Sequence, residues 1–396
     1  MTKKKLPELD ILRIVSILIV IIFVHMKDYG YSFYVEVNQY YIYFFNGLGI
    51  FVAMGSMVFL SGFGLFLNKD NRNIDSTGKL ITFLKKRFLR IFPLYWIAIP
   101  LFVVFLGYFD IDFLYLLAHI MGMQIIVAPI FGPPMLTLWF IGIIVVYYLI
   151  FIILSYLGSI KKIIPAAIVI LIIFVFLNVT FGFVEYRFFY YYFFFIAGIV
   201  IANIYTSQFY IRVKESFNKR SKLIPLIIAG CSAFLFYLIY QFLAEFSYSF
   251  FTLEYGTFIL SFILDMNPGF LQSAMAVILT NLIIIVYIIF TVSLFYLFIH
   301  IFRLIIPKIK LDSIFSRIAY STFCVYLFHR IFLIIYVAIL TYGLNIDTFN
   351  KDNVYLVYLF IPFIFLFSYF IQKLYDLIIK TIFRESQKVP KIEKDS

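Results

Sequence analysis

Long apolar stretches alternate with short polar ones along almost the whole chain of 396 residues. A helix that crosses a bilayer needs about 20 mainly apolar residues, and eleven stretches approach that length. They are residues 9–28, 42–67, 84–107, 112–130, 136–157, 163–181, 188–206, 223–243, 272–300, 317–341 and 354–380. The pattern predicts an all-α integral membrane protein.

Basic residues indicate which connections are cytoplasmic, because Lys and Arg concentrate in short cytoplasmic loops. The N-terminal lysines and the basic residues of 68–87 place both segments inside. If 112–130 crossed the membrane, Lys161 and Lys162 would lie outside and every later basic loop would be inverted. We therefore predict ten transmembrane helices, a re-entrant or interfacial segment at 112–130, and cytoplasmic N- and C-termini.

Three prolines around the end of the re-entrant segment also support the prediction that this segment is broken. They are Pro129, Pro133 and Pro134. No linker is long enough to separate domains, so we expect one transmembrane domain at 1–383 and a short charged cytoplasmic tail at 384–396. Residues 246–271 form the longest external connection that this topology predicts.

Composition excludes a soluble protein, since 64% of residues are hydrophobic and only 13% are charged. The mean hydropathy is +1.03. The formal net charge of +12 resides almost entirely in loops and tails, which fits membrane orientation and not nucleic-acid binding. The two cysteines lack metal-ligand spacing, so we expect no metal site. A multi-pass protein of the plasma membrane, in contact with the lipid bilayer, is the expectation.

Two ionisable residues lie in the first apolar stretch, where charge is costly and usually faces a partner or a cavity. His25 lies about 24 Å along the helix from Leu9, at 1.5 Å per residue. A neutral imidazole there takes a proton as a base or carries an acyl group as a nucleophile, unless it is simply hydrogen-bonded near the interface. Arg13, about 18 Å below His25, pairs with Asp10, reaches the interface or holds a phosphate.

Arg87 and Arg90 are one turn apart at the start of the third stretch, so they share a helix face at the cytoplasmic mouth. Two guanidiniums on one face suit bidentate contact with phosphate, and interfacial anchoring is the alternative. His329 lies near the middle of another stretch, a depth at which an ionisable group rarely faces lipid. Ser61-Gly62-Phe63-Gly64, in the second stretch, is typical of a close helix approach.

Six short motifs recur in the order found in a known family. They are Glu8 to Arg13 with His25, Phe59 to Phe63, Lys86 to Trp96, Leu138 to Phe140 followed by Tyr147 and Tyr148, Phe193 to Gly198, and Tyr326 to His329. Over nearly the whole chain they resemble the membrane-bound acyltransferase 3 family. That family transfers acetyl and other acyl groups, mostly to extracytoplasmic carbohydrates.

The resemblance implies a cytoplasmic acyl-CoA donor, commonly acetyl-CoA, an envelope glycan or lipid-linked sugar as acceptor, and no permanently bound cofactor. By the same resemblance, His25 and Arg13 are the catalytic residues, and Arg87 and Arg90 bind the donor. We also expect five residues to line the substrate cavity, of which Glu185 would meet the acceptor. They are Ser61, Trp139, Tyr148, Glu185 and His329.

The chain departs from the family pattern in the first helix, where eleven residues separate Arg13 from His25 instead of ten. On an ideal helix this moves the two side chains from about 20° to about 120° apart. A π-bulge would restore the alignment; otherwise the two never share a face. The chain also ends without the extra extracytoplasmic domain of some relatives, so a separate protein handles the acceptor or none is needed.

Two other functions compete with acyl transfer. A flippase or exporter of a glycan precursor also needs a polar path and arginines for lipid phosphate, but it does not need His25. An inactive relative kept for structure or partner binding is the third reading. Replacing His25 with Ala separates the first two, because it abolishes chemistry while transport survives at least partly.

Overall fold

The computed structural model describes residues 6–26, 29, 49–109, 111–208, 210–212, 215–216, 223–251, 270–305, 311–350 and 353–386. Within these ranges every regular element is a helix. In chain order they are α1 (Pro7–Ile19), η1 (Val20–His25), α4 (Gly49–Leu67), η3 (Lys69–Asn71), α5 (Thr77–Leu106), α6 (Phe113–Ile120), α7 (Gln124–Phe131), α8 (Trp139–Tyr156), α9 (Ile160–Phe181), α10 (Tyr186–Tyr205), α12 (Leu223–Phe251), α14 (Phe270–Ile305), α15 (Leu311–Tyr320), α16 (Thr322–Ala338), η4 (Ile339–Gly343), α17 (Val354–Tyr358) and α18 (Phe360–Ser386).

Eight helices in the described part of the chain are long and apolar enough to cross a membrane. They contain Thr77–Leu106, Trp139–Tyr156, Ile160–Asn178, Tyr186–Tyr205, Leu223–Tyr240, Ile285–Phe302, Thr322–Gly343 and Tyr355–Thr381. Helix α4 adds the apolar segment Val52–Leu67, and α1 runs directly into η1. The chain is therefore a multi-pass α-helical membrane protein, and the total of ten crossings stays a prediction.

The segment 112–130 does not form one long helix. It is divided into α6 and α7, each of eight residues and about 12 Å long, which is too short to cross a hydrocarbon core of about 30 Å. The predicted broken segment is confirmed, and the break between the two helices lies at Gly122, before the three prolines. Gly122 has a φ of +69°, a left-handed backbone conformation that disfavours any residue with a side chain. A Cβ there would also crowd the Val145 side chain, at 3.0 Å.

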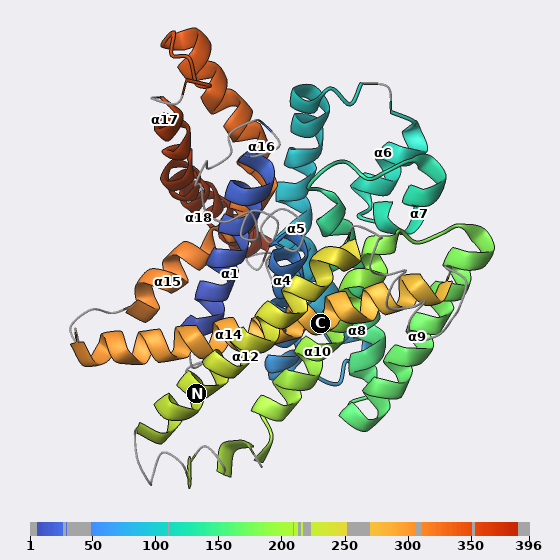
Figure 1. Cartoon of the computed structure of the whole chain (residues 1–396). Coiled ribbons are helices and arrows are strands. Elements are labelled where there is room, and N and C mark those ends of the chain that lie inside the picture. Colours follow the sequence, from blue (N-terminus) through green and yellow to red (C-terminus); the bar gives the residue numbers. More distant parts are fainter. Residues whose placement is uncertain are drawn as a thin grey trace, which may run out of the picture.

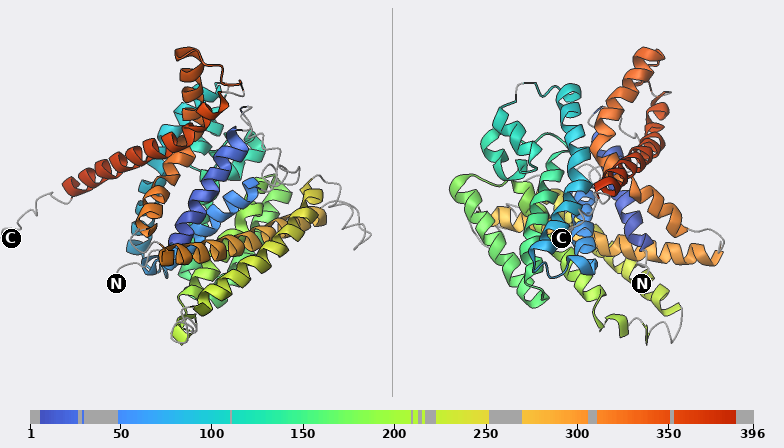
Figure 2. Two further views of the ribbon diagram at one scale, coloured as in Figure 1. Left: turned by 60° about the vertical axis from the view of Figure 1, so that its left-hand side comes forward. Right: turned by 180° about the vertical axis from the view of Figure 1, so that it is seen from behind.

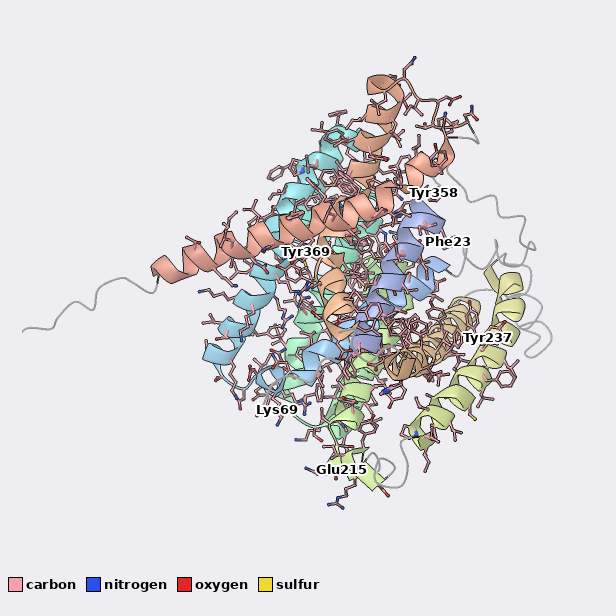
Figure 3. All side chains as sticks on the ribbon, turned by 90° about the vertical axis from the view of Figure 1, so that its left-hand side faces the viewer. Phe23, Lys69, Glu215, Tyr237, Tyr358 and Tyr369 are labelled. Atoms are coloured by element: carbon pink, nitrogen blue, oxygen red, sulfur yellow. The ribbon has the colours of Figure 1, made fainter. Side chains whose placement is uncertain are left out.

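A contact between two loops supports the same topology. Asn73 lies in the basic loop before α5, and its Oδ1 would be 3.2 Å from a Cβ at Gly158, in the turn before Lys161 and Lys162. Both loops therefore lie on one side, as they must if 112–130 does not cross. Figure 3 shows Lys69 and Glu215 at one end of the molecule and Phe23 and Tyr358 at the other. Which end is cytoplasmic stays a prediction.

Helices α4 and α10 form the closest packing in the bundle. A Cβ at Gly62 would lie 2.3 Å from the main-chain oxygen of Phe195, and one at Gly198 would lie 2.3 Å from that of Phe59. Only glycine permits this backbone approach. The predicted close helix approach is confirmed for Gly62 but not for Gly64, which has no atom within 4 Å of its Cβ position.

The other helices surround this pair. Helices α12 and α14 pack along each other across one face of the bundle (Figure 1). Helix α18 packs against α16 near its start and then projects away from the body (Figure 2). It continues to Ser386, past the predicted domain boundary at residue 383. The predicted loop 29–41 except Tyr29, most of 246–271 and the tail after Ser386 lie outside the described residues.

Candidate active site

The first helix contains a π-helical turn between Arg13 and His25, the irregularity that would compensate for the extra residue between them. After α1 the backbone forms a π-helical turn, η1, over Val20–His25. A π-turn accommodates one extra residue, so the eleven intervening residues behave as ten and His25 returns to within about 20° of Arg13 around the helix. The π-bulge alternative is therefore confirmed, and His25 is 3% exposed.

His25 faces His329 of α16, although the two are 304 positions apart in the sequence. Nδ1 of His25 is hydrogen-bonded to Nε2 of His329. The ring centroids are 4.7 Å apart and the ring planes differ by 5°. Because His329 is 1% exposed, both imidazoles are enclosed by protein.

Backbone carbonyls determine where the protons of this pair reside. Nδ1 of His329 contacts the main-chain oxygens of Val325 at 3.0 Å and Tyr326 at 2.8 Å. A carbonyl only accepts, so Nδ1 of neutral His329 carries the proton and Nε2 presents a lone pair. Nδ1–H of His25 must then donate to that lone pair. The remaining nitrogen, Nε2 of His25, is left unprotonated, as a base or nucleophile requires.

Arg330 supplies a buried positive charge next to the pair. Its side chain is 6% exposed and lies within electrostatic range of both imidazoles. The guanidinium carbon is 5.8 Å from the centroid of the Tyr29 ring. His329 is thus enclosed by protein, as predicted, and Arg330 is buried next to it.

Three guanidiniums gather on α1 and α5. Arg13 pairs with Asp10 at 3.6 Å and lies within electrostatic range of Arg90. Arg87 in turn lies within range of Arg90 and has a buried Nε without a hydrogen-bond partner. Among the described residues, Asp10 is the carboxylate that pairs with this cluster, so three guanidiniums leave excess positive charge that suits an anion with several oxygens.

The relative exposure of the two α5 arginines differs from the anchoring expectation. Arg87 is half-buried, whereas Arg90, which lies deeper in the apolar pattern, is exposed. Both arginines follow buried Phe83 on the same side of α5, Arg87 after one turn and Arg90 after two. Arg90 therefore forms the outer edge of the cluster.

Tyr148 of α8 joins the arginine cluster to α4. Its hydroxyl accepts a hydrogen bond from Ser61 Oγ at 3.4 Å and also bonds to the Arg87 side chain. The Arg87 guanidinium lies 5.6 Å from the Tyr148 ring centroid. Two predicted substrate residues, Ser61 and Tyr148, therefore lie beside Arg87, one of the predicted donor-binding arginines.

Trp139 and Glu185 belong to a second polar group at the start of α8 and α10. Arg187 pairs with Glu185 at 3.4 Å, and its guanidinium lies 4.9 Å from the Trp139 ring centroid. The other neighbour of Trp139 is Tyr191, whose ring is stacked on it at 5.7 Å. Arg187 and Tyr191 lie within electrostatic range of Tyr326, which connects this group to the histidine pair.

Several polar residues near the pair were not predicted from the sequence. Tyr326 donates a hydrogen bond to the Thr137 carbonyl, and its ring centroid is 6.1 Å from that of His329. Gln124 donates to Tyr95 and to the Leu138 carbonyl, while its own Oε1 is buried without a partner. A glutamine inside an apolar stretch is a signal that sequence reasoning passed over.

His119 of α6 has a structural role. Its Nδ1 donates to the Tyr115 carbonyl at 2.9 Å, and its Nε2 accepts from the Met135 amide at 3.0 Å. Both nitrogens are occupied, so His119 ties α6 to the loop before α8 and has no free position for chemistry.

Comparison with known proteins identifies one family. The family model described as an acyltransferase domain, that of acyltransferase 3, matches residues 6–373. No curated protein and no solved structure matches the chain. The matched region contains α1, the histidine pair, the arginine cluster and all candidate spans except the end of the last one, so the chain belongs to the acyltransferase 3 family of membrane acyltransferases.

Proposed function

We propose that the protein transfers an acyl group, most simply acetyl, from a cytoplasmic acyl-CoA to a hydroxyl of an extracytoplasmic or lipid-linked carbohydrate at the plasma membrane. The family supports acyl transfer in general. The observation that carries the proposal is the His25–His329 pair, whose hydrogen bonds leave Nε2 of His25 without a proton.

The donor binds, in this proposal, at the arginine cluster of Arg13, Arg87 and Arg90. Coenzyme A carries several phosphate groups, and guanidiniums form strong charge-assisted bonds with phosphate oxygens. Arg13 and His25 are about 18 Å apart along their helix. The acyl group of an acyl-CoA sits at the end of a long flexible arm, so the phosphates and the thioester carbonyl can occupy the two ends of this path.

The transfer step then uses Nε2 of His25. As a general base, it takes the proton of the acceptor hydroxyl while the hydroxyl oxygen bonds to the thioester carbonyl carbon. When the tetrahedral intermediate collapses, the carbon–sulfur bond breaks and the imidazolium returns the proton to the thiolate. As a nucleophile, the same nitrogen would carry the acyl group between donor and acceptor. Both routes require the tautomer that His329 holds.

His329 is therefore a positioning residue. It accepts the Nδ1 proton of His25 and is itself fixed by two carbonyls of its own helix. A base oriented by a hydrogen-bonded third group is the general arrangement of activated nucleophiles and bases. Here main-chain oxygens supply the orientation that a carboxylate supplies elsewhere.

Mass analysis of envelope glycans tests the proposal directly. A deletion strain should lose acyl groups from one glycan, and complementation with the wild-type gene should restore them. The His25→Ala variant should leave that glycan present but without its acyl groups, as the deletion does. A flippase would behave differently, because deletion would remove the glycan and His25→Ala would return it. An unchanged acyl profile in the deletion strain, grown where the protein is made, would contradict the proposal.

A further inference from the structure

The turn before α10 holds a residue in a strained conformation. Val184 has a φ of +70°, a left-handed conformation that is a genuine outlier for a β-branched residue. Its amide donates to the Ile126 carbonyl at 2.7 Å, and the next amide, that of Glu185, donates to the Ile125 carbonyl at 2.8 Å. The turn is thus fixed to α7 by main-chain bonds that determine where Glu185 stands.

Asn178 holds the same turn from the other side. Its Nδ2 donates to the main-chain oxygens of Phe183 at 3.0 Å and Val184 at 2.7 Å. The Val184 side chain is fully buried, so it packs in the protein interior while its backbone forms the turn. Strain that is held by the surrounding structure in this way is concentrated at functional sites in proteins.

Glu185 presents an unused hydrogen-bond acceptor at the end of this turn. The residue is 8% exposed, and its Oε1 is paired with Nε of Arg187 at 3.4 Å. Its Oε2 is buried and has no hydrogen-bond partner. Burial raises the pKa of Glu185 even though Arg187 lies beside it. A buried carboxylate oxygen without a donor is costly, so a ligand that brings a donor is favoured there.

Glu185 is close to the transfer site through a layer of aromatic rings. Its partner Arg187 stacks on Trp139, and Trp139 stacks on Tyr191. Both Arg187 and Tyr191 lie within electrostatic range of Tyr326, the neighbour of His329.

We propose that Glu185 and the Val184 turn form the acceptor subsite, in which the free carboxylate oxygen binds a hydroxyl of a neutral, polyhydroxylated acceptor. The charge of Arg187 is already balanced by Glu185, so nothing in this group attracts an anion, and the carboxylate repels one. The subsite therefore selects neutral sugars over sugars that carry a carboxylate at this position. This inference rests on the proposed acyl transfer.

The test measures acetyl transfer by purified protein in lipid nanodiscs, with labelled acetyl-CoA as donor. The acceptor probes are octyl β-glucoside and octyl β-glucuronide, which differ by one carboxylate. Wild type should use the glucoside at least tenfold better in kcat/KM. Glu185→Gln should raise the KM for the glucoside roughly tenfold or more, because the charge-assisted bond from the sugar hydroxyl to the carboxylate is lost. It should also reduce the preference for the glucoside over the glucuronide. The KM for acetyl-CoA should not change.

Two further variants guard against a loss of fold. Glu215→Gln removes an exposed carboxylate at the lower end of the molecule in Figure 3, outside the Val184 turn, and should match wild type. Asn178→Ala loosens the turn and should raise the KM for the glucoside without changing that for acetyl-CoA. If wild type acetylates the glucoside and Glu185→Gln does so equally well, the subsite is refuted. Consumption of acetyl-CoA without labelling of the glucoside also refutes it, whereas no consumption at all refutes acyl transfer itself.

Discussion

Replacing Gly62 with Ala should separate the two helices at the centre of the bundle. The new Cβ would lie 2.3 Å from the Phe195 oxygen and 3.1 Å from its carbonyl carbon. Both are backbone atoms and cannot rotate away, so α4 and α10 must move apart by roughly 1 Å to reach ordinary van der Waals contact. Overpacking of this kind costs about 1–3 kcal/mol. The shift would also break the 3.4 Å bond from neighbouring Ser61 to Tyr148.

Gly64→Ala is the matched control, two residues further along the same helix. It has open space at its Cβ position, and alanine favours a helix over glycine by about 0.5–1 kcal/mol. The two substitutions should therefore change stability in opposite directions. Thermal unfolding in nanodiscs measures the difference, and acetyl-CoA turnover reports the loss of the Ser61 bond. A Gly62→Ala variant as stable and active as Gly64→Ala would refute the close-packing account.

Two further predictions concern pH and donor binding. Burial lowers the pKa of His119 to about 4, below the ordinary 6.5, so the unfolded state takes up the proton first and stability falls as pH drops from 6.5 towards 4. Between pH 7.5 and pH 5 this loss is about 2 kcal/mol, and thermal unfolding should show a shallower pH dependence in His119→Gln. Arg87→Gln should raise the KM for acetyl-CoA roughly tenfold or more, with a smaller rise in Arg87→Lys. Neither should alter turnover of acetyl-pantetheine, which lacks the nucleotide phosphates; an equal effect on both donors would contradict phosphate binding.

The sequence predicts most of the architecture because hydrophobic length and loop charge act locally. Segment 112–130 illustrates this, since the positive-inside rule argued against its crossing, and the structure divides it into two short helices. The rule does not locate the break. Gly122 ends α6 because of its left-handed backbone and the proximity of Val145, and both are properties of the packed protein.

The sequence indicated many of the candidate site residues, but not which of them contact one another. His25 and His329 were both singled out, yet a bond between residues 304 positions apart has no signature in one sequence. Ser61 and Tyr148 were expected to line the substrate cavity, and their contact with Arg87 of the arginine cluster could not be read from the sequence. The strained Val184 and the unpaired oxygen of Glu185 depend on three-dimensional contacts, so sequence patterns do not reveal them.

The central claim is that His329 holds His25 in the tautomer that frees Nε2, and one series of rates tests it most directly. Acetyl-CoA turnover should be measured for wild type, His25→Ala, His329→Gln and His329→Leu in nanodiscs. His25→Ala should fall to background, a loss of at least about 10²-fold. His329→Gln retains an oxygen that accepts the Nδ1 proton and should keep much more activity than His329→Leu, with little change in the KM for acetyl-CoA. Equal rates for the Gln and Leu variants, or wild-type turnover by His25→Ala, would contradict the account.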